Sequence, residues 1–120
     1  VFANEEESKA FTGKSPVDSL DDLAAQCEIA VVKIGKEGSL IKSGKNVVKI
    51  GVVPGKVIDT TGAGDQYAAG FLHGYIEHQE IEQCGKLGAL LAEVVISNYG
   101  ARIPDNLWPM IEEKAQKIID

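Results

Sequence analysis

The chain has 120 residues, of which 44% are apolar and 25% charged, proportions typical of a folded globular protein and not of an extended disordered one. Its net charge of −6, with no cluster of Lys or Arg, argues against nucleic acid as a partner. No apolar run approaches the roughly 20 residues of a membrane span, so we expect no membrane partner either.

The first elements in chain order are a strand end and two helices. Apolar VFA at the start is followed by Asn4 and Glu7, whose spacing is that of a capping box, and this predicts a short helix that Gly13 ends. A second helix is expected over residues 18–26. Its apolar face consists of Leu20, Leu23 and Ala24.

Strands are predicted next. The run IAVVKI, residues 29–34, is continuous and β-branched, which is typical of a strand covered on both faces in a parallel sheet. SLIKS and NVVKIGVV, residues 39–43 and 46–53, are expected to be strands around a turn at Gly44–Lys45. KVIDT, residues 56–60, is a further short strand or strand end.

Helices complete the chain. From Gly62 the apolar period becomes helical, with Ala63, Tyr67, Phe71 and Tyr75 spaced by four. A second long helix is expected over residues 81–97 with Gly100 at its end, and a last one over residues 106–120, with Pro109 in its first turns. Strands that precede and alternate with helices, without repeats, predict an α/β arrangement in one domain.

The segment DTTGAGD, residues 59–65, is the strongest candidate for chemistry. If a helix begins near Gly62, the free N–H groups of its first turn and the positive end of the helix dipole form an anion site, and Gly62 and Gly64 leave it open. Asp65 then stands beside that site, as a base for phosphoryl transfer would. The residues alone equally allow Asp59 and Asp65 to be helix caps and the glycines to form an entry turn.

Other reactive side chains form no recognisable site. Neither a Walker loop nor a complete dinucleotide fingerprint is present. His73 and His78 lie five residues apart and would not share one helix face around a metal. Cys27 and Cys84 are lone thiols, which, with no secretory signal at the N-terminus, predict a cytoplasmic protein.

The pattern DTTGAGD-x-x-x-A-G-F, residues 59–71, closely resembles the C-terminal signature of the ribokinase/PfkB family of carbohydrate and nucleoside kinases. NEEE at residues 4–7, KIGKEG at 33–38 and SNYGA at 97–101 are similar to further elements of that family, in the same order. The resemblance implies a ribokinase-like three-layer α/β/α sandwich with a mostly parallel, doubly wound sheet. Residues 1–120 would form the C-terminal part of one kinase domain, without the N-terminal half of the sheet and the lid.

The resemblance also implies roles for individual residues. Asp65 would be the catalytic base, and Gly62, Ala63 and Gly64, with the Asp65 amide, would hold the γ-phosphate of ATP. Asn4 and Glu7 would hold Mg²⁺, through water, and the phosphates.

The rest of the nucleotide site and a cation site would follow the same family pattern. The implied nucleotide-site residues are Lys33, Gly35, Gly38, Val53, Gly88 and Ala92, and Lys33 departs from the Thr or Ser often found there. The implied ligands of a monovalent cation such as K⁺ are Asp59, Thr61, Val95, Asn98 and Gly100. Gln66 replaces the small residue that commonly follows the base, either facing solvent or touching the substrate.

The implied activity is ATP-dependent transfer of a phosphoryl group to a sugar hydroxyl. An adenosine or nucleoside kinase is the alternative within the family, and a non-catalytic nucleotide-binding or interaction module is the alternative outside it. We expect this chain to be inactive by itself, and a homodimer, where one forms, to assemble through the lid.

Overall fold

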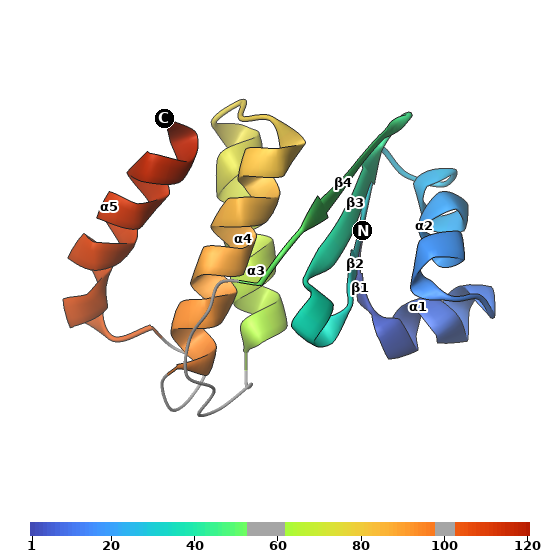
Figure 1. Ribbon diagram of the computed structural model, residues 1–120, viewed down its shortest axis with the longest axis horizontal. Helices are drawn as coiled ribbons and strands as arrows, with labels where there is room; N and C mark the ends of the chain where they lie inside the picture. Colours follow the sequence, from blue (N-terminus) through green and yellow to red (C-terminus); the bar gives the residue numbers. More distant parts are fainter. Residues whose placement is uncertain (53–61, 98–102) are drawn as a thin grey trace. The chain divides into compact units, whose positions relative to one another are not determined.

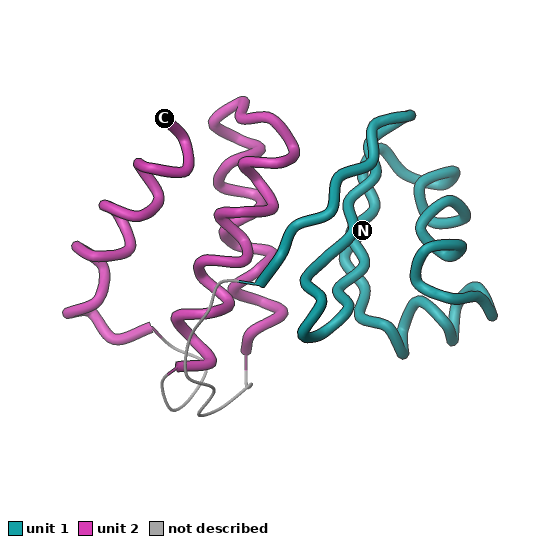
Figure 2. The backbone as a smooth tube through the Cα atoms, in the orientation of Figure 1, with its two compact units in different colours: residues 1–52 teal, residues 53–120 magenta. Residues whose placement is uncertain are grey.

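The computed structural model describes residues 1–52, 62–97 and 103–120. The chain is divided into two compact units, residues 1–52 and 53–120, shown in teal and magenta in Figure 2. That both belong to one kinase domain stays a prediction.

The first unit contains a four-stranded sheet and two helices. Its elements are β1 (Phe2–Asn4), α1 (Glu5–Thr12), α2 (Pro16–Ala24), β2 (Ile29–Lys33), a 3₁₀ turn (Gly35–Glu37), β3 (Ser39–Ser43) and β4 (Asn46–Ile50). The strand order is β1-β2-β3-β4, and α1 and α2 lie along one side of the sheet (Figure 1).

The sheet in this unit is mixed. β1 pairs with β2 in parallel, but β2 with β3 and β3 with β4 are antiparallel. Short turns can join only antiparallel neighbours. The turns at residues 36–38 and 44–45 are short, and they join β2 to β3 and β3 to β4. Among the described strands, one pairing is parallel and two are antiparallel, so this sheet is mixed where we expected a mostly parallel one. The predicted turn at Gly44–Lys45 is confirmed, but β4 ends at Ile50 rather than at residue 53.

Helix caps in the first unit agree with the local sequence. Asn4 caps α1, and Gly13 ends it in the left-handed conformation (φ 73°). α2 begins two residues before the predicted start, because Ser15 caps it and Pro16 takes its first position, a pairing that favours helix initiation. The same helix ends at Ala24, two residues before the predicted end.

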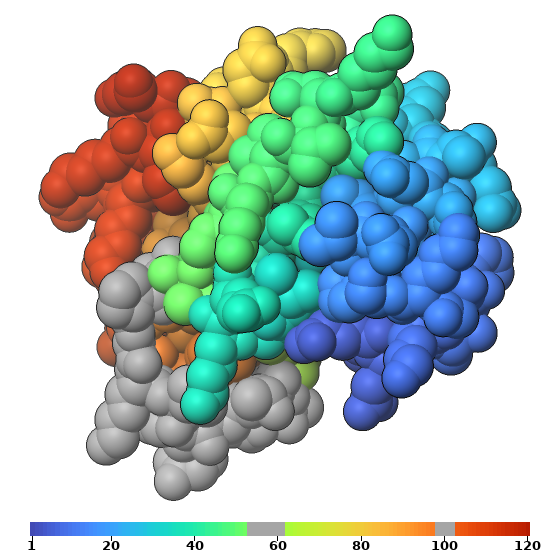
Figure 3. All heavy atoms as spheres, turned by 45° about the vertical axis from the view of Figure 1, so that its right-hand side comes forward, coloured from blue at the N-terminus to red at the C-terminus, as the bar shows by residue number. Residues whose placement is uncertain are grey.

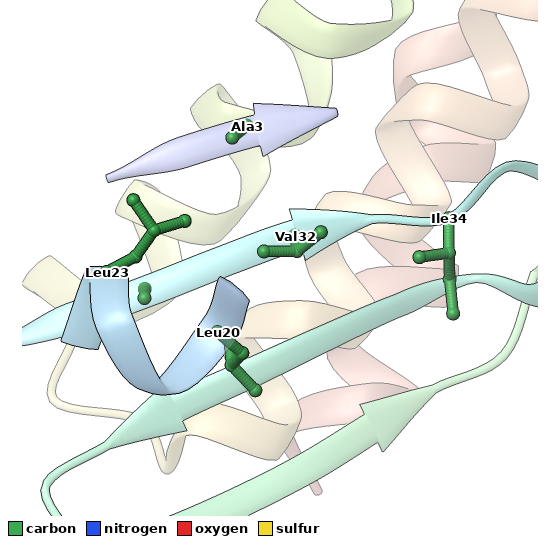
Figure 4. Close-up of a cluster of buried hydrophobic side chains, with 6 residues drawn as sticks. Ala3, Leu20, Leu23, Val32 and Ile34 are labelled. Atoms are coloured by element: carbon green, nitrogen blue, oxygen red, sulfur yellow. The ribbon is translucent and has the colours of Figure 1, made fainter. Parts of the chain in front are cut away.

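The core of the first unit forms between α2 and the strands. Ala3, Ala30, Val32 and Ile34 pack with Leu20 and Leu23 of α2, as Figure 4 shows. All three central residues of β2, Ala30–Val32, are buried, which is the pattern expected of a strand covered on both faces. This core fixes β1 and β2 side by side, and so fixes the positions of their carboxyl ends.

The second unit is helical in its described part. It contains α3 (Ala63–Ile76), α4 (Ile81–Ile96), a 3₁₀ turn (Asp105–Leu107) and α5 (Trp108–Ile119). These confirm the three predicted helices, although α4 ends at Ile96 and Gly100 lies outside the described residues. Tyr67 and Phe71 of α3 are buried, whereas Tyr75 is 45% exposed although it continues their spacing.

The contacts within this unit are between neighbouring helices. α3 and α4 are antiparallel neighbours joined by a short turn, and α4 packs on α5 through a cluster that includes Leu90, Val94, Val95, Ile103 and Ile111. Residues 53–61, with the predicted strand at 56–60, lie outside the described part. No described helix is both long and apolar enough to cross a membrane.

Candidate functional site

The start of α3 has the geometry predicted for an anion site. Gly62 precedes the helix in the left-handed conformation (φ 79°) and has no side chain to cap it. The first hydrogen bond of the helix runs from the amide of Gln66 to the carbonyl of Gly62, at 3.0 Å. The N–H groups of Ala63, Gly64 and Asp65 therefore precede the helical hydrogen-bond ladder, where they can donate to an anion.

Asp65 is exposed in this first turn, while the next turn anchors the helix. Tyr67 is 4% exposed and its ring stacks on Phe71, with centroids 6.4 Å apart and planes at 20°. The carboxylate of Asp65 thus stands on the open side of a helix whose other side is held in place. A carboxylate at such a position can accept a proton next to a bound anion.

The nucleotide residues predicted in the first unit lie at one end of its sheet. Asn4 and Lys33 are register partners at the carboxyl ends of the parallel strands β1 and β2, and Gly35 lies two residues after Lys33. In open α/β sheets, ligands bind outside the carboxyl ends of parallel strands. The structure therefore brings Asn4, Glu7, Lys33 and Gly35 to the end of the sheet where a ligand is expected.

Asn4 and Glu7 form the predicted capping box. The Asn4 side-chain oxygen accepts from the Glu7 amide at 2.8 Å, and Glu7 Oε1 accepts from the Asn4 amide at 3.0 Å. The capping box uses only one carboxylate oxygen of Glu7. The hydrogen bond fixes the position of the carboxylate, which can still bind a hydrated cation. Mg²⁺ usually keeps several waters and takes one or two carboxylates together with substrate phosphates, so these residues fit it.

Two further glutamates precede Glu7 on the same helix. Glu5 and Glu6 are exposed, and the space-filling view in Figure 3 shows the segment of α1 and α2, in blue, at the surface. A Cβ added to Gly35 would lie 3.6 Å from Glu5 Oε1. The proximity of Glu5 to Gly35 has no signal in the sequence, because only the pairing of β1 with β2 creates it.

The two glycines of the KIGKEG segment differ in what surrounds them. Gly35 adopts φ 60° with room beside it, whereas a Cβ on Gly38 (φ 99°) would lie 1.8 Å from the carbonyl oxygen of Ile50. Gly38 is therefore required by the β3–β4 pairing, whatever it does for a nucleotide. That either glycine admits ATP stays a prediction.

The α4 residues predicted for the nucleotide and cation sites are distributed between buried and half-buried positions. Gly88 is buried, and a Cβ there would lie 2.8 Å from the carbonyl oxygen of Tyr67 on α3. Val95 is fully buried in the α4–α5 cluster, and Ala92 is half-buried. The close approach of α3 is thus sufficient reason for a glycine at position 88.

The remaining predicted site residues cannot be placed. Val53, Asp59, Thr61, Asn98 and Gly100 lie outside the described residues. The expected cation site therefore stays a prediction.

Gly70 and Gly74 were not predicted to be residues that allow α3 to approach α4 closely. Each would bring a Cβ to within 3 Å of α4, at 2.5 Å and 2.9 Å respectively. The signal was available in the sequence, since glycine weakens a helix interior and persists there when backbones must approach closely.

Comparison with known proteins gives a consistent result. The family model described as "pfkB family carbohydrate kinase" matches residues 1–108. An uncharacterized sugar kinase of Archaeoglobus fulgidus is 52% identical over 75 residues, covering 62% of this chain and 30% of its own. A nucleoside kinase of Methanothermobacter thermautotrophicus is 36% identical over 108 residues, covering 88% of this chain and 34% of its own.

Solved structures agree on the fold. The adenosine kinase of Sinorhizobium meliloti superposes with a TM-score of 0.86 at 41% identity, over 95% of this chain and 36% of that one. The fold is thus the predicted ribokinase-like α/β fold, with helices flanking a mixed sheet. The chain spans about a third of the length of these relatives. With the family model matching most of its length, the chain belongs to the pfkB family of carbohydrate kinases.

Proposed function

We propose that this chain supplies the phosphate-transfer end of an ATP-dependent kinase whose acceptor is a hydroxyl of a sugar. The observation that carries the proposal is the start of α3, where exposed Asp65 stands in the same turn as the amides of Ala63 and Gly64, directly after a left-handed glycine. A base and a group of anion donors in one helical turn are the parts that phosphoryl transfer requires.

The reaction would proceed by direct transfer. Asp65 takes the proton of the acceptor hydroxyl, the oxygen forms a bond to the γ-phosphorus, and the bond from that phosphorus to the β,γ-bridging oxygen breaks to release ADP. The amides of residues 62–65 donate to the phosphoryl oxygens, on which negative charge is distributed during transfer. The turn thus both activates the acceptor and stabilises the transferred group.

The ends of β1 and α1 would hold the metal and the phosphates. Glu7, fixed by its hydrogen bond to the Asn4 amide, would bind Mg²⁺ through water, and Mg²⁺ when bound neutralises phosphate charge. K⁺ would bind at Asp59, Thr61, Val95, Asn98 and Gly100 and would act on the shape of the anion site. ATP would lie against Lys33, Gly35, Gly38, Val53 and Ala92.

A nucleoside is the second candidate acceptor, and the names of two relatives support it. The proteins of M. thermautotrophicus and S. meliloti are named nucleoside and adenosine kinases, whereas that of A. fulgidus is named a sugar kinase. A non-catalytic module is the third candidate. The presence of Asp65 beside two glycines argues against it, because a protein that only binds nucleotide has no need of a base.

The first experiment replaces the base in the full-length protein. Asp65→Asn keeps the shape of the side chain and removes proton acceptance, so we expect kcat to fall by about 10²- to 10⁴-fold while the Kd for ATP stays near the wild-type value. Glu77→Gln is the matched control, since it makes the same chemical change at the exposed far end of α3. Near-normal kcat in Asp65→Asn would overturn the proposal.

The second experiment identifies the acceptor. ADP release is measured for the full-length protein with a panel of pentoses, hexoses and nucleosides, with Asp65→Asn as the background. Release with sugars alone, or with nucleosides alone, decides between the two acceptor classes. Release with neither, together with tight ATP binding, would support the non-catalytic module.

A further inference from the structure

α3 and α4 touch backbone to backbone on both sides of one crossing. A Cβ added to Gly70 of α3 would lie 2.5 Å from the carbonyl oxygen of Leu87 and 2.8 Å from its carbonyl carbon. Both atoms belong to the main chain of α4, so no side-chain rotation could relieve the overlap. α3 can therefore keep this position only with glycine at residue 70.

The reciprocal contact comes from α4. A Cβ added to Gly88 would lie 2.8 Å from the carbonyl oxygen of Tyr67 and 3.1 Å from two carbon atoms of its ring. Gly70 and Gly88 thus face each other's helices, and each clears the backbone of the other. Together they set the distance between the two helices at this level.

The crossing lies next to the catalytic turn. Tyr67 follows Asp65 by two residues and Gly70 follows it by five, which is about 3 Å and 7.5 Å along a helix with a rise of 1.5 Å per residue. The ring of Tyr67 is buried and lies against Gly88 of α4, and this contact between the two helices restrains the rotation of α3 about its axis. A displacement of α3 at this crossing would therefore be transmitted to Asp65.

We propose that Gly70 and Gly88 are positioning residues for Asp65: by letting α3 and α4 meet backbone to backbone, they hold the first turn of α3 where its carboxylate and amides can act together. This inference rests on the proposed function of Asp65. It also gives Gly88 a role that requires no contact with the nucleotide.

Gly74 supplies the matched control. It lies on the same helix, and a Cβ there would also meet α4, at 2.9 Å from Leu87 Cδ1 and 3.2 Å from Cα and Sγ of Cys84. Its closest neighbour is the end of a flexible side chain, and it lies nine residues from Asp65. Alanine at this position therefore adds the same methyl group while leaving the catalytic turn in place.

The test compares Gly70→Ala, Gly88→Ala and Gly74→Ala in the full-length protein, with steady-state kinetics on the folded fraction. We expect kcat to fall by on the order of 10²-fold for Gly70→Ala and Gly88→Ala, because a displacement of about 1 Å at a reacting group has that effect, and KM for ATP to stay near the wild-type value. For Gly74→Ala we expect kcat to stay near wild type even where its Tm falls.

The outcomes separate this inference from the proposed function. If Asp65→Asn keeps its kcat, the proposed function is wrong and the inference falls with it. If Asp65→Asn is inactive but both glycine variants keep their kcat, only this inference is overturned. A rise in KM for ATP at constant kcat in Gly88→Ala would assign that residue to the nucleotide site instead. If Gly70→Ala does not fold, Gly88→Ala, whose closest contact is longer, gives the same test; failure of both to fold would also overturn the inference, because the glycines would then serve the fold alone.

Discussion

The starts of α1 and α3 differ in how the free N–H groups of the first turn are treated: α1 has a side-chain cap and α3 has none. Every helix begins with N–H groups that lack partners in the helix. At the start of α1, the side chain of Asn4 accepts a hydrogen bond from the Glu7 amide, and the side chain of Glu7 accepts one from the Asn4 amide. Side chains of the chain itself thus satisfy these two backbone donors. At α3, Gly62 offers no side chain at all.

The difference indicates what each start is suited to do. A capped start gains stability and fixes its side chains, which suits residues that hold a hydrated metal. A start with glycine before it loses the cap and leaves its amides accessible, which suits a site for an anion. The lack of a side-chain cap is not sufficient by itself, since Glu80, the residue before α4, also forms no side-chain cap. What distinguishes α3 is the combination of Gly62, Gly64 and Asp65 in one turn.

The largest loss of kcat among the variants at the two helix starts is expected for Gly62→Ala. Alanine disfavours the left-handed conformation that Gly62 adopts, so the first turn of α3 would shift and we expect kcat of the full-length protein to fall by roughly 10²-fold. Gly13→Ala is the matched control, because Gly13 has nearly the same φ (73° against 79°) and a Cβ there meets nothing within 4 Å. It should cost about 1 kcal/mol of stability and leave kcat unchanged. Equal kcat losses in both variants would attribute the effect to general strain.

A smaller effect is expected at the capped start, from Glu7→Gln. Glutamine can still complete a capping box, so the stability of α1 should be preserved, but the carboxylate charge is lost and the apparent affinity for Mg²⁺ should fall by about 10-fold. The affinity is measured by titrating Mg²⁺ in the phosphotransfer assay.

The control for Glu7→Gln removes a cap that has no proposed role in binding. Ser15→Ala on α2 should lower the free energy of unfolding by about 1 kcal/mol without changing the Mg²⁺ requirement, because the Ser15 hydroxyl bonds to Asp18 of its own helix, accepting from the amide at 3.4 Å and donating to the carboxylate at 3.2 Å. An unchanged Mg²⁺ requirement in Glu7→Gln would mean that Glu7 is a cap and nothing more.

The smallest expected effect is a pH dependence of stability that comes from Cys84 in the second unit. Burial raises the pKa of the Cys84 thiol on α4 above its ordinary value of 9.0. A pKa that is higher in the folded state contributes stability below the ordinary value, and that stability is lost as pH rises through the folded pKa. We therefore expect the urea midpoint to fall above about pH 9 in wild type and to fall less in Cys84→Ala, which cannot ionise. Equal slopes in the two proteins would contradict this.

The reactivity of the two cysteine thiols can report on local opening of the structure. Cys27 in the first unit is half-buried, with its Sγ 3.0 Å from the Leu23 carbonyl oxygen, whereas Cys84 is fully buried. A thiol reagent should therefore label Cys27 first in the folded protein. Labelling of Cys84 should require the α3–α4 pair to open.

Local features were predicted well, because they depend on neighbours in sequence. The capping box at Asn4, the end of α1 at Gly13, and the helices at 63–76 and 81–96 each follow from a few adjacent residues. The apolar face of α2 predicts a start two residues too late, because the Ser15-Pro16 pair determines where the helix begins. Tyr75 shows the limit of the periodic pattern, since it keeps the spacing of Tyr67 and Phe71 but remains exposed.

By itself the sequence determined which functional groups are present: a glycine-rich turn with one carboxylate and a capped helix with a second carboxylate. It also determined the order of motifs that places the chain in its family. Only the tertiary structure decided what several residues are for. Gly38 and Gly88 looked like space for a nucleotide, yet each clears the backbone of a neighbouring element. Periodicity and spacing describe one segment at a time, whereas close backbone contacts depend on two segments that lie far apart in the sequence.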